Sequence, residues 1–592
     1  MTQDFRAESA IIVFVMIRRP SRVAALSILL VLGSSLVGGW LGTRAVAGTS
    51  RLSESLRTYT AILSVIEDQY VEEVKPERVI SASIREMLRT LDPHSNFLET
   101  KEYSNLQERQ KGSYYGLGIT VSAVDGNITV VSPFEGTPAY RLGIRAGDII
   151  SRIEDEDARG MGIDDAVKRL RGPKGSAVRI TIVRQGYDQP LEFTVIRDEI
   201  PLHSVQYYFM LDKKTGYLRH TDFNETTACR PGEGKGCEKE LEKALKELKA
   251  QGATAVVMDI RDNPGGLLEQ AFAVSNLFLK KGQLVVFTRG RTKRDESNYI
   301  TEGESPFADM PLVLLVSKHS ASASEIVAGA LQDHDRGLIV GERTFGKGLV
   351  QTIMPLHNVR GYALALTTAR YYTPSGRLIQ RDYNSMALED YHSPRDRKTC
   401  EEGQGEPKLT DAGRKVYGGD GITPDYCVEP ETPSKLVSYL ITRQAFVNFS
   451  RGFAGTGSTG QAQEIAGTGK RSGIQSAKVR VVELGFEVDD RTWGEFRAFL
   501  TKQKLRFTEE ELAAQREAVS QHIVEEVLRS AYGEREARRR VSQWDPQVRK
   551  AMEVVGKAVL LLKDPQKFIA ERQAEGRIAS SAAPAPNAAV RQ

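Results

Sequence analysis

Cysteine is scarce in this chain, with Cys229, Cys237, Cys400 and Cys427 the only four among 592 residues. No CxxC pair is present and no histidine pair stands nearby at ligand spacing, which disfavours zinc, and we expect no metal site. If the chain is exported, an even number of cysteines permits disulfides. Cys229 and Cys237 bracket a glycine-rich loop, and Cys400 and Cys427 flank a polar segment, so each pair is a candidate disulfide. Free thiols and a metal site are the alternatives.

The chain also lacks an excess of charge of either sign. Its 81 basic and 77 acidic residues leave a net charge of +4, which argues against a protein that coats nucleic acid. One dense basic run, REARRRVSQ, lies within a helical pattern and is typical of a solvated helix face. No tandem repeat of solenoid length is present. We therefore expect neither a nucleic-acid partner nor a solenoid fold.

Only one hydrophobic run has the surroundings of a targeting segment, and it lies near the N-terminus. Arg18, Arg19 and Arg22 precede an apolar stretch at about 23–41, and Ala45-Val46-Ala47 then forms a small-x-small site. This is the three-part layout of a secretory signal. Because the stretch is near the lower length limit for a spanning helix, an uncleaved membrane anchor is the alternative. In either case residues 1–47 predict that the remainder lies outside the cytoplasm, in the periplasm or anchored to the inner membrane.

The rest of the chain divides by the period of its hydrophobic pattern. Residues 51–110 predict helices, with one apolar stripe that could pack on the core or on a second subunit, formed by Tyr59, Ile62, Leu63, Ile66 and Tyr70. Residues 113–199 predict short strands with glycine turns and one helix. From 200 to 433 apolar strands alternate with amphipathic helices, which predicts a central sheet covered by helices.

The last part of the chain differs in composition. Residues 434–475 contain a Gly/Ser/Thr-rich stretch, GFAGTGSTGQAQEIAGTGKRSG, which predicts a flexible linker region. Residues 476–592 predict a charged helical extension that ends in a disordered tail rich in alanine and proline. The extension could serve a partner protein, oligomerisation or shielding of an active site.

One glycine-rich segment, GERTFGKGLVQ, is close to a phosphate-binding loop but lacks its hydroxyl. In such a loop Ser or Thr follows the lysine and binds magnesium, whereas Gly348 follows Lys347 here. The lysine has apolar neighbours, Phe345 and Leu349 among them, and a desolvated amine has a lowered pKa. Gln351 is placed to orient the amine through a hydrogen bond. The segment therefore favours a lysine base over a phosphate site.

A candidate nucleophile, Ser322, stands 25 positions before Lys347, between the buried strand MPLVLLVSKHS and the helix SASEIVAGALQD. A serine in this place is usually a helix N-cap. A nucleophile there would also gain from nearby backbone N–H groups and from the helix dipole. His319, on the incoming strand, cannot easily reach Ser322, and no histidine is framed by a suggestive loop. A Ser-Lys pair is a recognised variant of the catalytic triad.

The segment RDNPGG supplies a third feature, because it follows another buried strand, ATAVVMDI. Gly265 and Gly266 permit a tight turn whose backbone N–H groups could hold an oxyanion. An ordinary strand-to-helix turn is the alternative, and it would be favoured if this segment stood alone. The combination of a serine, a buried lysine and this turn favours an acyl-transfer site.

Together these segments resemble the C-terminal processing peptidases, a family of exported serine proteases. The resemblance runs in order over about 52–429 and rests on SASASEIVAGALQD, GERTFGKGLVQ, DIRDNPGG, RYYTPSGRLIQ, GITPDYCVE and LDPHSNFL. It implies a serine endopeptidase in which Ser322 is the nucleophile, Lys347 the base and Gln351 the residue that orients the lysine. It further implies an oxyanion hole that combines the N–H of Ala323 with that of Gly265 or, as second choice, Gly266. No cofactor is implied.

Residues 113–199 are similar to a PDZ domain. The string YGLGI resembles a carboxylate-binding loop, and GTPAYRLGIRAGDII follows it; the loop residues are Tyr115, Gly116, Leu117, Gly118 and Ile119. Such a loop cradles a C-terminal carboxylate while the peptide adds a strand to the sheet. The resemblance implies partners that are proteins or peptides with exposed C-termini, and a location in the bacterial cell envelope. A homo-oligomer or an adaptor partner is a further expectation.

The expected architecture is therefore an α+β multidomain fold. A PDZ module of the β-sandwich type is inserted between an N-terminal helical segment and a mixed α/β serine protease core, and a helical extension follows.

Overall fold

The computed structural model describes residues 52–124, 126–184, 187–234, 236–303, 305–392, 400, 405–455 and 480–582. The predicted targeting segment, residues 1–47, lies outside the described residues. So do residues 456–479 of the glycine-rich stretch and residues 583–592 of the predicted tail. Within the ranges given above, no helix is both long enough and apolar enough to cross a membrane. The chain divides into two compact units, Met1–Thr90 and Leu91–Gln592.

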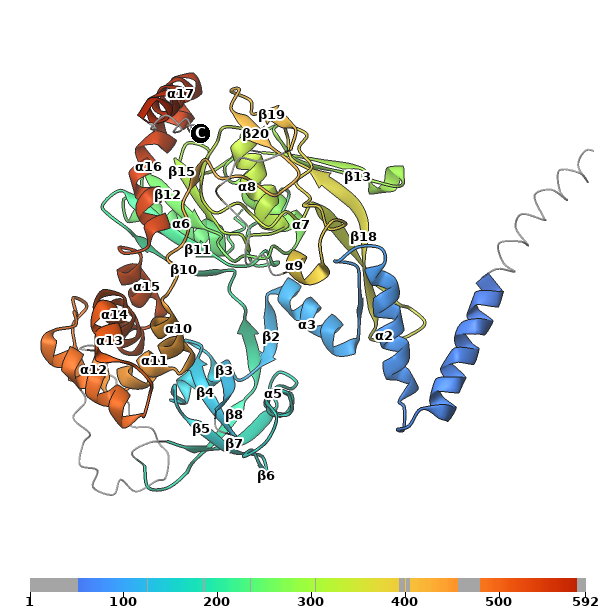
Figure 1. The fold of residues 1–592 in the computed structure, drawn as a ribbon, viewed down its shortest axis with the longest axis vertical. Helices are drawn as coiled ribbons and strands as arrows, with labels where there is room; N and C mark the ends of the chain where they lie inside the picture. The colour runs from blue at the N-terminus through green and yellow to red at the C-terminus, as the bar shows by residue number, and fades with distance from the viewer. Residues whose placement is uncertain are drawn as a thin grey trace, which may run out of the picture. The chain divides into compact units, whose positions relative to one another are not determined.

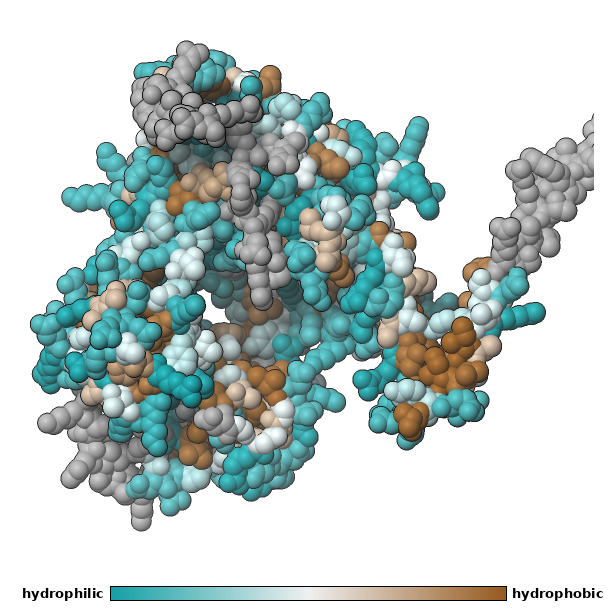
Figure 2. Space-filling model, in the orientation of Figure 1, coloured by the Kyte–Doolittle hydropathy of each residue, from teal (hydrophilic) through white to brown (hydrophobic). Residues whose placement is uncertain are grey.

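The described part of the first unit is a pair of helices, residues 52–69 and α2 (Pro76–Arg89). The predicted apolar stripe on the first helix is only partly buried, because Leu63 and Ile66 are half-buried while Ile62 is exposed. Figure 2 shows hydrophobic side chains gathered on this helix pair. The helical prediction for this region is confirmed, and its apolar face is incompletely covered within the unit.

The PDZ module is inserted through a two-stranded ribbon. β2 (Ser113–Gly116) and β9 (Asp198–Pro201) pair antiparallel, so the chain enters and leaves the module along neighbouring strands. Between them lies a sheet in the order β3-β4-β5-β7-β8, with β6 paired to β5. The elements of the module are β3 (Ile119–Val124), β4 (Asn127–Pro133), α4 (Pro138–Arg141), β5 (Ile149–Ile153), β6 (Glu156–Asp157), α5 (Ile163–Leu170), β7 (Ala177–Val183) and β8 (Leu191–Ile196).

Alternating residues build the core of this module. In β7, Val178, Ile180 and Ile182 are buried, while Ala177 before them and Arg179 between the first two are exposed. This alternation is the pattern of an antiparallel sheet with one face on the core and one in water. β3 forms one edge of the sheet, with β4 as its partner. An extended peptide could therefore pair with the free side of β3.

The region predicted as the α/β core is built on a six-stranded sheet in the order β10-β11-β12-β15-β16-β21. β10 is antiparallel to β11, and the pairs from β11 to β21 are parallel. The strands are β10 (Val205–Met210), β11 (Thr215–His220), β12 (Ala255–Asp259), β15 (Leu312–Val316), β16 (Leu338–Gly341) and β21 (Tyr426–Cys427). The helices on one face are α6 (Glu240–Ala250), α7 (Leu268–Asn276) and α8 (Ala323–Asp333).

The opposite face of this sheet is covered by a helix from the C-terminal extension, α16 (Pro546–Lys563). In β12, Val256 and Met258 pack toward α6, α7 and α8, while Val257 packs toward α16. Figure 1 shows α16 running beside β12 and β15. Because both faces are covered, the strand AVVMD is apolar throughout up to its final aspartate rather than alternating.

A second sheet has the order β1-β18-β13-β14, and β17 pairs along the other side of β18. Its strands are β1 (Asn96–Leu98), β13 (Leu284–Gly290), β14 (Ser297–Ile300), β17 (Leu349–Pro355) and β18 (Ala363–Tyr372). The pairing of β1 with β18 brings the segment LDPHSNFL beside the partner strand of β17, and β17 is the strand that follows the glycine-lysine loop. Smaller elements nearby are α3 (Thr100–Lys111), η1 (Lys293–Asp295), α9 (Leu388–His392), β19 (Pro407–Leu409) and β20 (Lys415–Tyr417).

The C-terminal part forms a helical core of its own before α16. Its other elements are α10 (Lys435–Thr442), α11 (Ala445–Ser450), β22 (Phe453–Gly455), β23 (Arg480–Val482), α12 (Asp490–Lys502), α13 (Glu509–Ala514), α14 (Arg516–Tyr532), α15 (Glu534–Val541) and α17 (Pro565–Ala582). The region predicted as a flexible linker, 434–475, thus begins with two helices. Val437, Leu440 and Phe446 are buried in the helical core, and this helical spacing outweighs the flexible composition, which starts only at Gly452.

The predicted α+β multidomain architecture is confirmed: N-terminal helices, an inserted PDZ module, a mixed α/β core and C-terminal helices are all present.

Candidate active site

Ser322 lies at the turn between β15 and α8, at the N-cap position of the helix. Its backbone adopts φ 56° and ψ −113°, a conformation that costs energy for any residue with a side chain. The side chain makes no capping hydrogen bond. Instead the carboxylate of Glu325 accepts a hydrogen bond from the Ser322 N–H at 2.9 Å. Ser322 and Glu325 have the arrangement of a capping box, and the strained turn presents the Ser322 hydroxyl as a half-buried group.

Lys347 lies in a glycine loop directly before β17. Gly346 has φ +90°, and a Cβ atom there would lie 2.8 Å from the Cβ of Arg381, so only glycine permits this close packing. Burial lowers the pKa of the Lys347 amine to about 8, while the carboxylates of Glu325 and Asp92 act in the opposite direction. A lysine with this pKa has a neutral fraction near physiological pH, which is the form that can accept a proton.

Two side chains join the backbones of Ser322 and Lys347. The same oxygen of Glu325, Oε2, accepts from both N–H groups at 2.9 Å. The other oxygen, Oε1, accepts from Gly346 N–H at 2.7 Å and from Thr344 Oγ1 at 2.5 Å. The hydroxyl of Tyr371 contacts the carbonyl oxygens of Ser322, at 3.1 Å, and of Lys347. The serine turn and the lysine loop are thus held against each other from two sides.

Histidine is a poorer candidate base in this region. His94 packs beside Phe345, and its Nε2 forms a hydrogen bond of 2.8 Å with the hydroxyl of Tyr391. Burial, with the nearby Lys347 charge, lowers the pKa of His94 to about 3. His334 has both ring nitrogens engaged, with Asp411 and with a backbone carbonyl. A group with a pKa near 3 accepts protons too weakly to serve as an efficient base at neutral pH.

Gln351 does not contact the Lys347 amine through any hydrogen bond among the described residues. Its Nε2 donates to Thr367 Oγ1 at 3.3 Å. The N–H of Thr367 in turn donates to Ser95 Oγ at 3.1 Å, and Ser95 Oγ donates to Asp92 Oδ2 at 2.7 Å. Gln351 is therefore the end of a polar chain that starts in the segment LDPHSNFL, and its orienting role stays a prediction.

The turn at Gly265 lies directly against the serine turn. A Cβ atom on Gly265, whose φ is +96°, would lie 2.8 Å from the backbone nitrogen of Ala323 and 2.9 Å from the Cβ of Ser322. The N–H of Gly265 is engaged by the side-chain oxygen of Asn263 at 2.9 Å. For the N–H groups of Gly266 and Ala323, no acceptor is found in the described part of the chain. The turn that carries Gly265 therefore packs against the serine turn, and the N–H groups of Gly265 and Gly266 differ in that only the first is engaged by Asn263.

The five residues of the predicted carboxylate loop fall into two groups. Tyr115 and Gly116 belong to β2, where they pair with β9 in the connecting ribbon. Leu117 is buried in the core of the module, and Gly118, with φ +78°, would place a Cβ 2.3 Å from Thr137. Ile119 opens the edge strand β3. Only residues 117–119 therefore lie at the start of the edge strand with which a bound peptide could pair.

The four cysteines form two disulfides, Cys229–Cys237 and Cys400–Cys427. Cys229, Cys237 and Glu233 are also the one group of metal-ligand type found among the residues that the structure describes. Because both sulfurs of this group are bonded to each other, neither is a thiolate that could bind a metal ion.

Glu325, Tyr371 and Asp92 are site residues that the sequence reasoning did not single out. A signal existed for Glu325, because serine followed three residues later by glutamate is a capping-box pattern, and the N–H of Ser322 is indeed bonded to Glu325. Tyr371 and Asp92 lie in two segments that carry the resemblance, RYYTPSGRLIQ and LDPHSNFL. No local pattern gives either residue a role, because each reaches the site from a strand or turn distant in sequence.

Two family models match parts of this chain. The sequence model of peptidase family S41 matches residues 214–384, and that of the PDZ domain matches residues 129–184. A carboxy-terminal-processing protease from Bartonella bacilliformis is 37% identical over 393 residues, which cover 66% of this chain and 78% of that protein. The carboxy-terminal processing protease CtpA of Bacillus subtilis is 32% identical over 359 residues, covering 60% of this chain and 72% of that protein. The solved photosystem II D1 C-terminal processing protease is 27% identical, with a TM-score of 0.32 over 63% of this chain and 88% of its own.

The Bartonella protein is covered to 78% of its length at 37% identity, and the PDZ and S41 models match separate parts of this chain. The resemblance noted in the sequence is thereby confirmed: the chain is a serine-type peptidase that belongs to the PDZ-containing carboxy-terminal-processing proteases of family S41.

Proposed function

We propose that this protein is an exported endopeptidase that cleaves peptide bonds with a Ser322–Lys347 dyad and recruits substrates by their C-terminal tails. The observation that carries the dyad is the bridge between the two loops. Glu325 and Tyr371 tie the backbone of the serine to that of the lysine, while burial lowers the lysine pKa to about 8. A nucleophile and a base need this proximity and this protonation state together.

The reaction follows the general course of acyl transfer. The neutral Nζ of Lys347 takes the proton from Ser322 Oγ as the oxygen attacks the carbonyl carbon of the substrate. The protonated amine then gives its proton to the leaving nitrogen, and the peptide bond breaks to leave an acyl group on Ser322. Water, deprotonated by the same amine, attacks the acyl group and releases the second product.

The oxyanion would be held by backbone N–H groups, of which Ala323 is the first. For the second donor, the hydrogen bond between Gly265 N–H and Asn263 reverses the order expected from the sequence. The N–H of Gly266 has no acceptor among the described residues, so we assign it as the second donor and Gly265 as the residue that makes the close approach to Ser322.

The dyad is tested by the pH dependence of acylation. A fluorophosphonate or activated ester, followed by peptide mapping, is expected to label Ser322. Because the neutral amine is the active form, the rate should rise about tenfold per pH unit below pH 8 and level off above it. Labelling of another residue, or a rate that is already level by pH 6, would contradict the assignment, since the latter indicates a base of much lower pKa.

The PDZ module is proposed to bind the C-terminal carboxylate of substrates at residues 117–119 and to add the tail as a strand beside β3. Gly118 is critical because a Cβ there would collide with Thr137 at 2.3 Å. We expect Gly118→Ala to raise KM for a substrate with a free apolar C-terminus by about tenfold or more, since the loop cannot keep its conformation.

The matched control for this change is Gly136→Ala. Gly136 also has a positive φ, +75°, but a Cβ there meets nothing within 4 Å, so it carries the backbone strain without the collision. Amidation of the substrate C-terminus should reproduce the loss in the wild type and add little in Gly118→Ala. Equal KM values for the two glycine variants would argue against the loop as the tail site.

Export is supported by residues 1–47 and by the two disulfides, since disulfides persist in oxidising compartments. We propose that the catalytic part lies outside the cytoplasm, released or anchored by its N-terminus. Cell fractionation, with protease accessibility in spheroplasts, tests the location, and the N-terminal sequence of the mature protein distinguishes cleavage near Ala47 from an anchor. The mass of the native particle would show whether the protein forms a homo-oligomer or binds an adaptor partner.

A further inference from the structure

The C-terminal extension packs against the protease core through helix α16. Val548, Ala551, Val554, Ala558 and Leu561 of α16 share one hydrophobic cluster with strands of the central sheet. The partners on the sheet are fully buried by this contact: Val257 is 0% exposed and Val313 is 1% exposed. The start of α16 is thereby placed at the end of β12, immediately before the turn RDNPGG.

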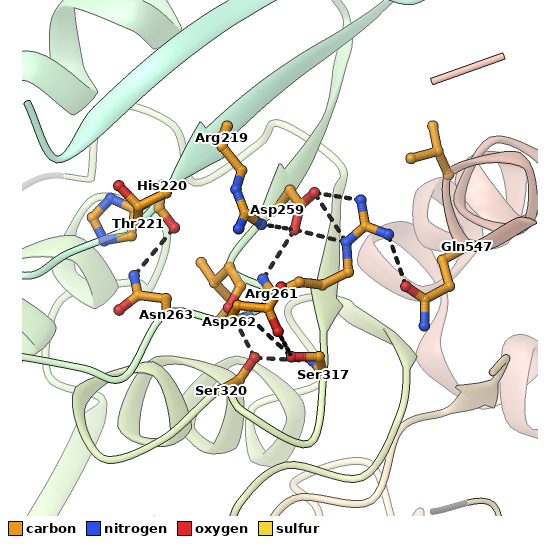
Figure 3. A network of polar contacts seen from close by, with 12 residues as sticks. Arg219, His220, Thr221, Asp259, Arg261, Asp262, Asn263, Ser317, Ser320 and Gln547 are labelled. Carbon is orange, nitrogen blue, oxygen red and sulfur yellow. Dashed lines mark hydrogen bonds and ion pairs between the residues drawn. The ribbon is translucent and has the colours of Figure 1, made fainter. Parts of the chain in front are cut away.

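The contact at this point is polar and centres on Arg261, as Figure 3 shows. On one side the guanidinium pairs with the carboxylate of Asp259, with Nη2 at 2.6 Å from Oδ2. On the other side, Nη1 donates to Asp545 Oδ2 at 2.7 Å and to Gln547 Oε1 at 2.8 Å. Arg219 adds a second guanidinium to Asp259 at 2.7 Å. Arg261 is thus held between the catalytic sheet and the extension.

The positive charges of this cluster are balanced only when Asp545 of the C-terminal extension is included. Arg219 and Arg261 carry two positive charges, and Asp259, which is 1% exposed, supplies one negative charge. Burial raises the pKa of Asp259, but the two arginines outweigh that effect and hold it below its ordinary value. Asp545 supplies the second negative charge. Without it, the sheet would bury an arginine in excess, which is unfavourable in a low-dielectric interior.

Arg261 stands directly before the oxyanion turn, and the turn is tied to its surroundings at each step. Asp262 has a strained φ of 55°; its N–H donates to Ser317 Oγ at 2.9 Å, and Ser317 Oγ donates to its carboxylate. The side chain of Asn263 donates to the carbonyl of His220 at 3.1 Å, and its Oδ1 accepts from the N–H of Gly265. A strained turn of this kind persists only when its surroundings hold it.

The same turn is bonded to the nucleophile turn. The carbonyl of Asn263 accepts from the N–H of Ala321 at 3.0 Å and from Ser324 Oγ at 2.8 Å. These two residues flank Ser322 and Ala323. If the backbone at Arg261 shifted, Asn263 would therefore move as well, and with it both proposed oxyanion donors.

We propose that Asp545 and Gln547 of the C-terminal extension are positioning residues for the oxyanion hole, and that they act through Arg261. The extension then supports the active site by holding Arg261, the residue that precedes the turn Asp262–Gly266. This inference rests on the proposed catalytic function of Ser322 and Lys347, because a positioning role has meaning only for a working site.

The test uses the full-length protein and a short peptide substrate, with kcat and KM measured separately and with thermal unfolding of each variant. Asp545→Ala and Gln547→Ala are expected to lower kcat about tenfold or more and to leave KM within about twofold, because misplacement of the donors weakens the transition state and not substrate binding. Asp545→Asn keeps a neutral acceptor for Arg261 and the helix cap but loses the negative charge, so its kcat should lie between those of the wild type and Asp545→Ala.

The matched control is Asp564→Ala. Asp545 caps α16 through the N–H groups of Gln547 and Val548, and Asp564 caps α17 through the N–H of Lys567 at 3.0 Å. Both variants lose a helix cap, but Asp564 lies at the far end of α16 from the turn. Asp564→Ala should shift the melting temperature and leave kcat unchanged. If Asp545→Ala does not fold, Gln547→Ala, which leaves the Asp545 cap in place, carries the test.

The outcomes separate this inference from the proposed function. Normal kcat in both Asp545→Ala and Gln547→Ala would overturn the positioning role, and so would a fall in kcat that Asp564→Ala reproduces. Ser322→Ala is measured beside them: if it retains activity, the proposed function itself fails. A dead Ser322→Ala with fully active Asp545 and Gln547 variants would leave the dyad intact and remove only the role of the extension.

Discussion

Ser322→Ala and Lys347→Ala are each expected to lower peptide hydrolysis by on the order of 10⁴-fold or more, the size of loss seen when a nucleophile or its base is removed. The physical reason differs for the two. Without Ser322 Oγ there is no atom to form the acyl group. Without Lys347, the hydroxyl keeps its proton at the moment of attack. Because the two groups act as a unit, the double variant should be no slower than either single one.

The lysine variant also carries a prediction about stability. Burial disfavours the charged amine, as the pKa of about 8 indicates, so Lys347→Ala should not lower the melting temperature. Lys318→Ala is the control, because that lysine lies four residues before Ser322 in a partly exposed position near Glu342. Residual activity above about one per cent of wild type in either dyad variant, measured with enzyme free of contaminating protease, would refute the dyad.

Glu325→Ala should have the second-largest effect, on activity and stability together. Glu325 is 0% exposed, and its carboxylate accepts from the N–H groups of Ser322, Gly346 and Lys347 and from Thr344 Oγ1. Its removal leaves these buried donors without an acceptor, at a cost of about 3 kcal/mol or more in unfolding free energy. We expect kcat to fall about 100-fold, since the serine and lysine loops lose their common anchor.

Glu325→Gln tests whether the site needs the carboxylate of Glu325 or only a side chain of that size. The amide keeps the volume of the carboxylate, but its NH₂ group would face backbone N–H donors, so half of the anchor is lost. Glu342→Gln is the matched control, because Glu342 is also buried, at 5% exposed, but its contacts to Lys318 are 3.5 Å or longer. If Glu325→Gln and Glu342→Gln showed the same kcat, Glu325 would not be the anchor of the site.

The sequence was sufficient for those parts of the site in which a backbone conformation demands a particular residue. Gly346 and Gly265 adopt positive φ and admit a neighbouring chain where a Cβ would collide, and glycine at such points can be read directly from a string of letters. The same holds for Ser322, whose place between a buried strand and a helix is set by local patterns. These features single out the proposed nucleophile, the proposed base and the turn from the sequence.

The hydrogen-bond partners of the side chains in the site did not follow from the sequence. Gln351 was expected, from its spacing and from the family resemblance, to orient the lysine; its amide donates to Thr367 on the neighbouring strand, and the orienting role stays a prediction. Gly265 was the first choice as oxyanion donor, yet Asn263 engages its N–H. Spacing along the chain limits which residues can meet, but several acceptors compete for each donor, and only the packed structure decides among them.

By itself the sequence determined the modular order of the protein, because periodicity and glycine placement are local properties. Its short motifs also determined, through their resemblance to a family, the class of the protein and the residues proposed as its reactive groups. Only the tertiary structure decided that Glu325 and Tyr371 join serine to lysine and that α16 of the C-terminal extension closes the sheet behind the active site. Arg261 and Asp545 are 284 residues apart and nevertheless share a hydrogen bond. Contacts at that separation depend on the burial of two hydrophobic faces against each other, which no local pattern encodes.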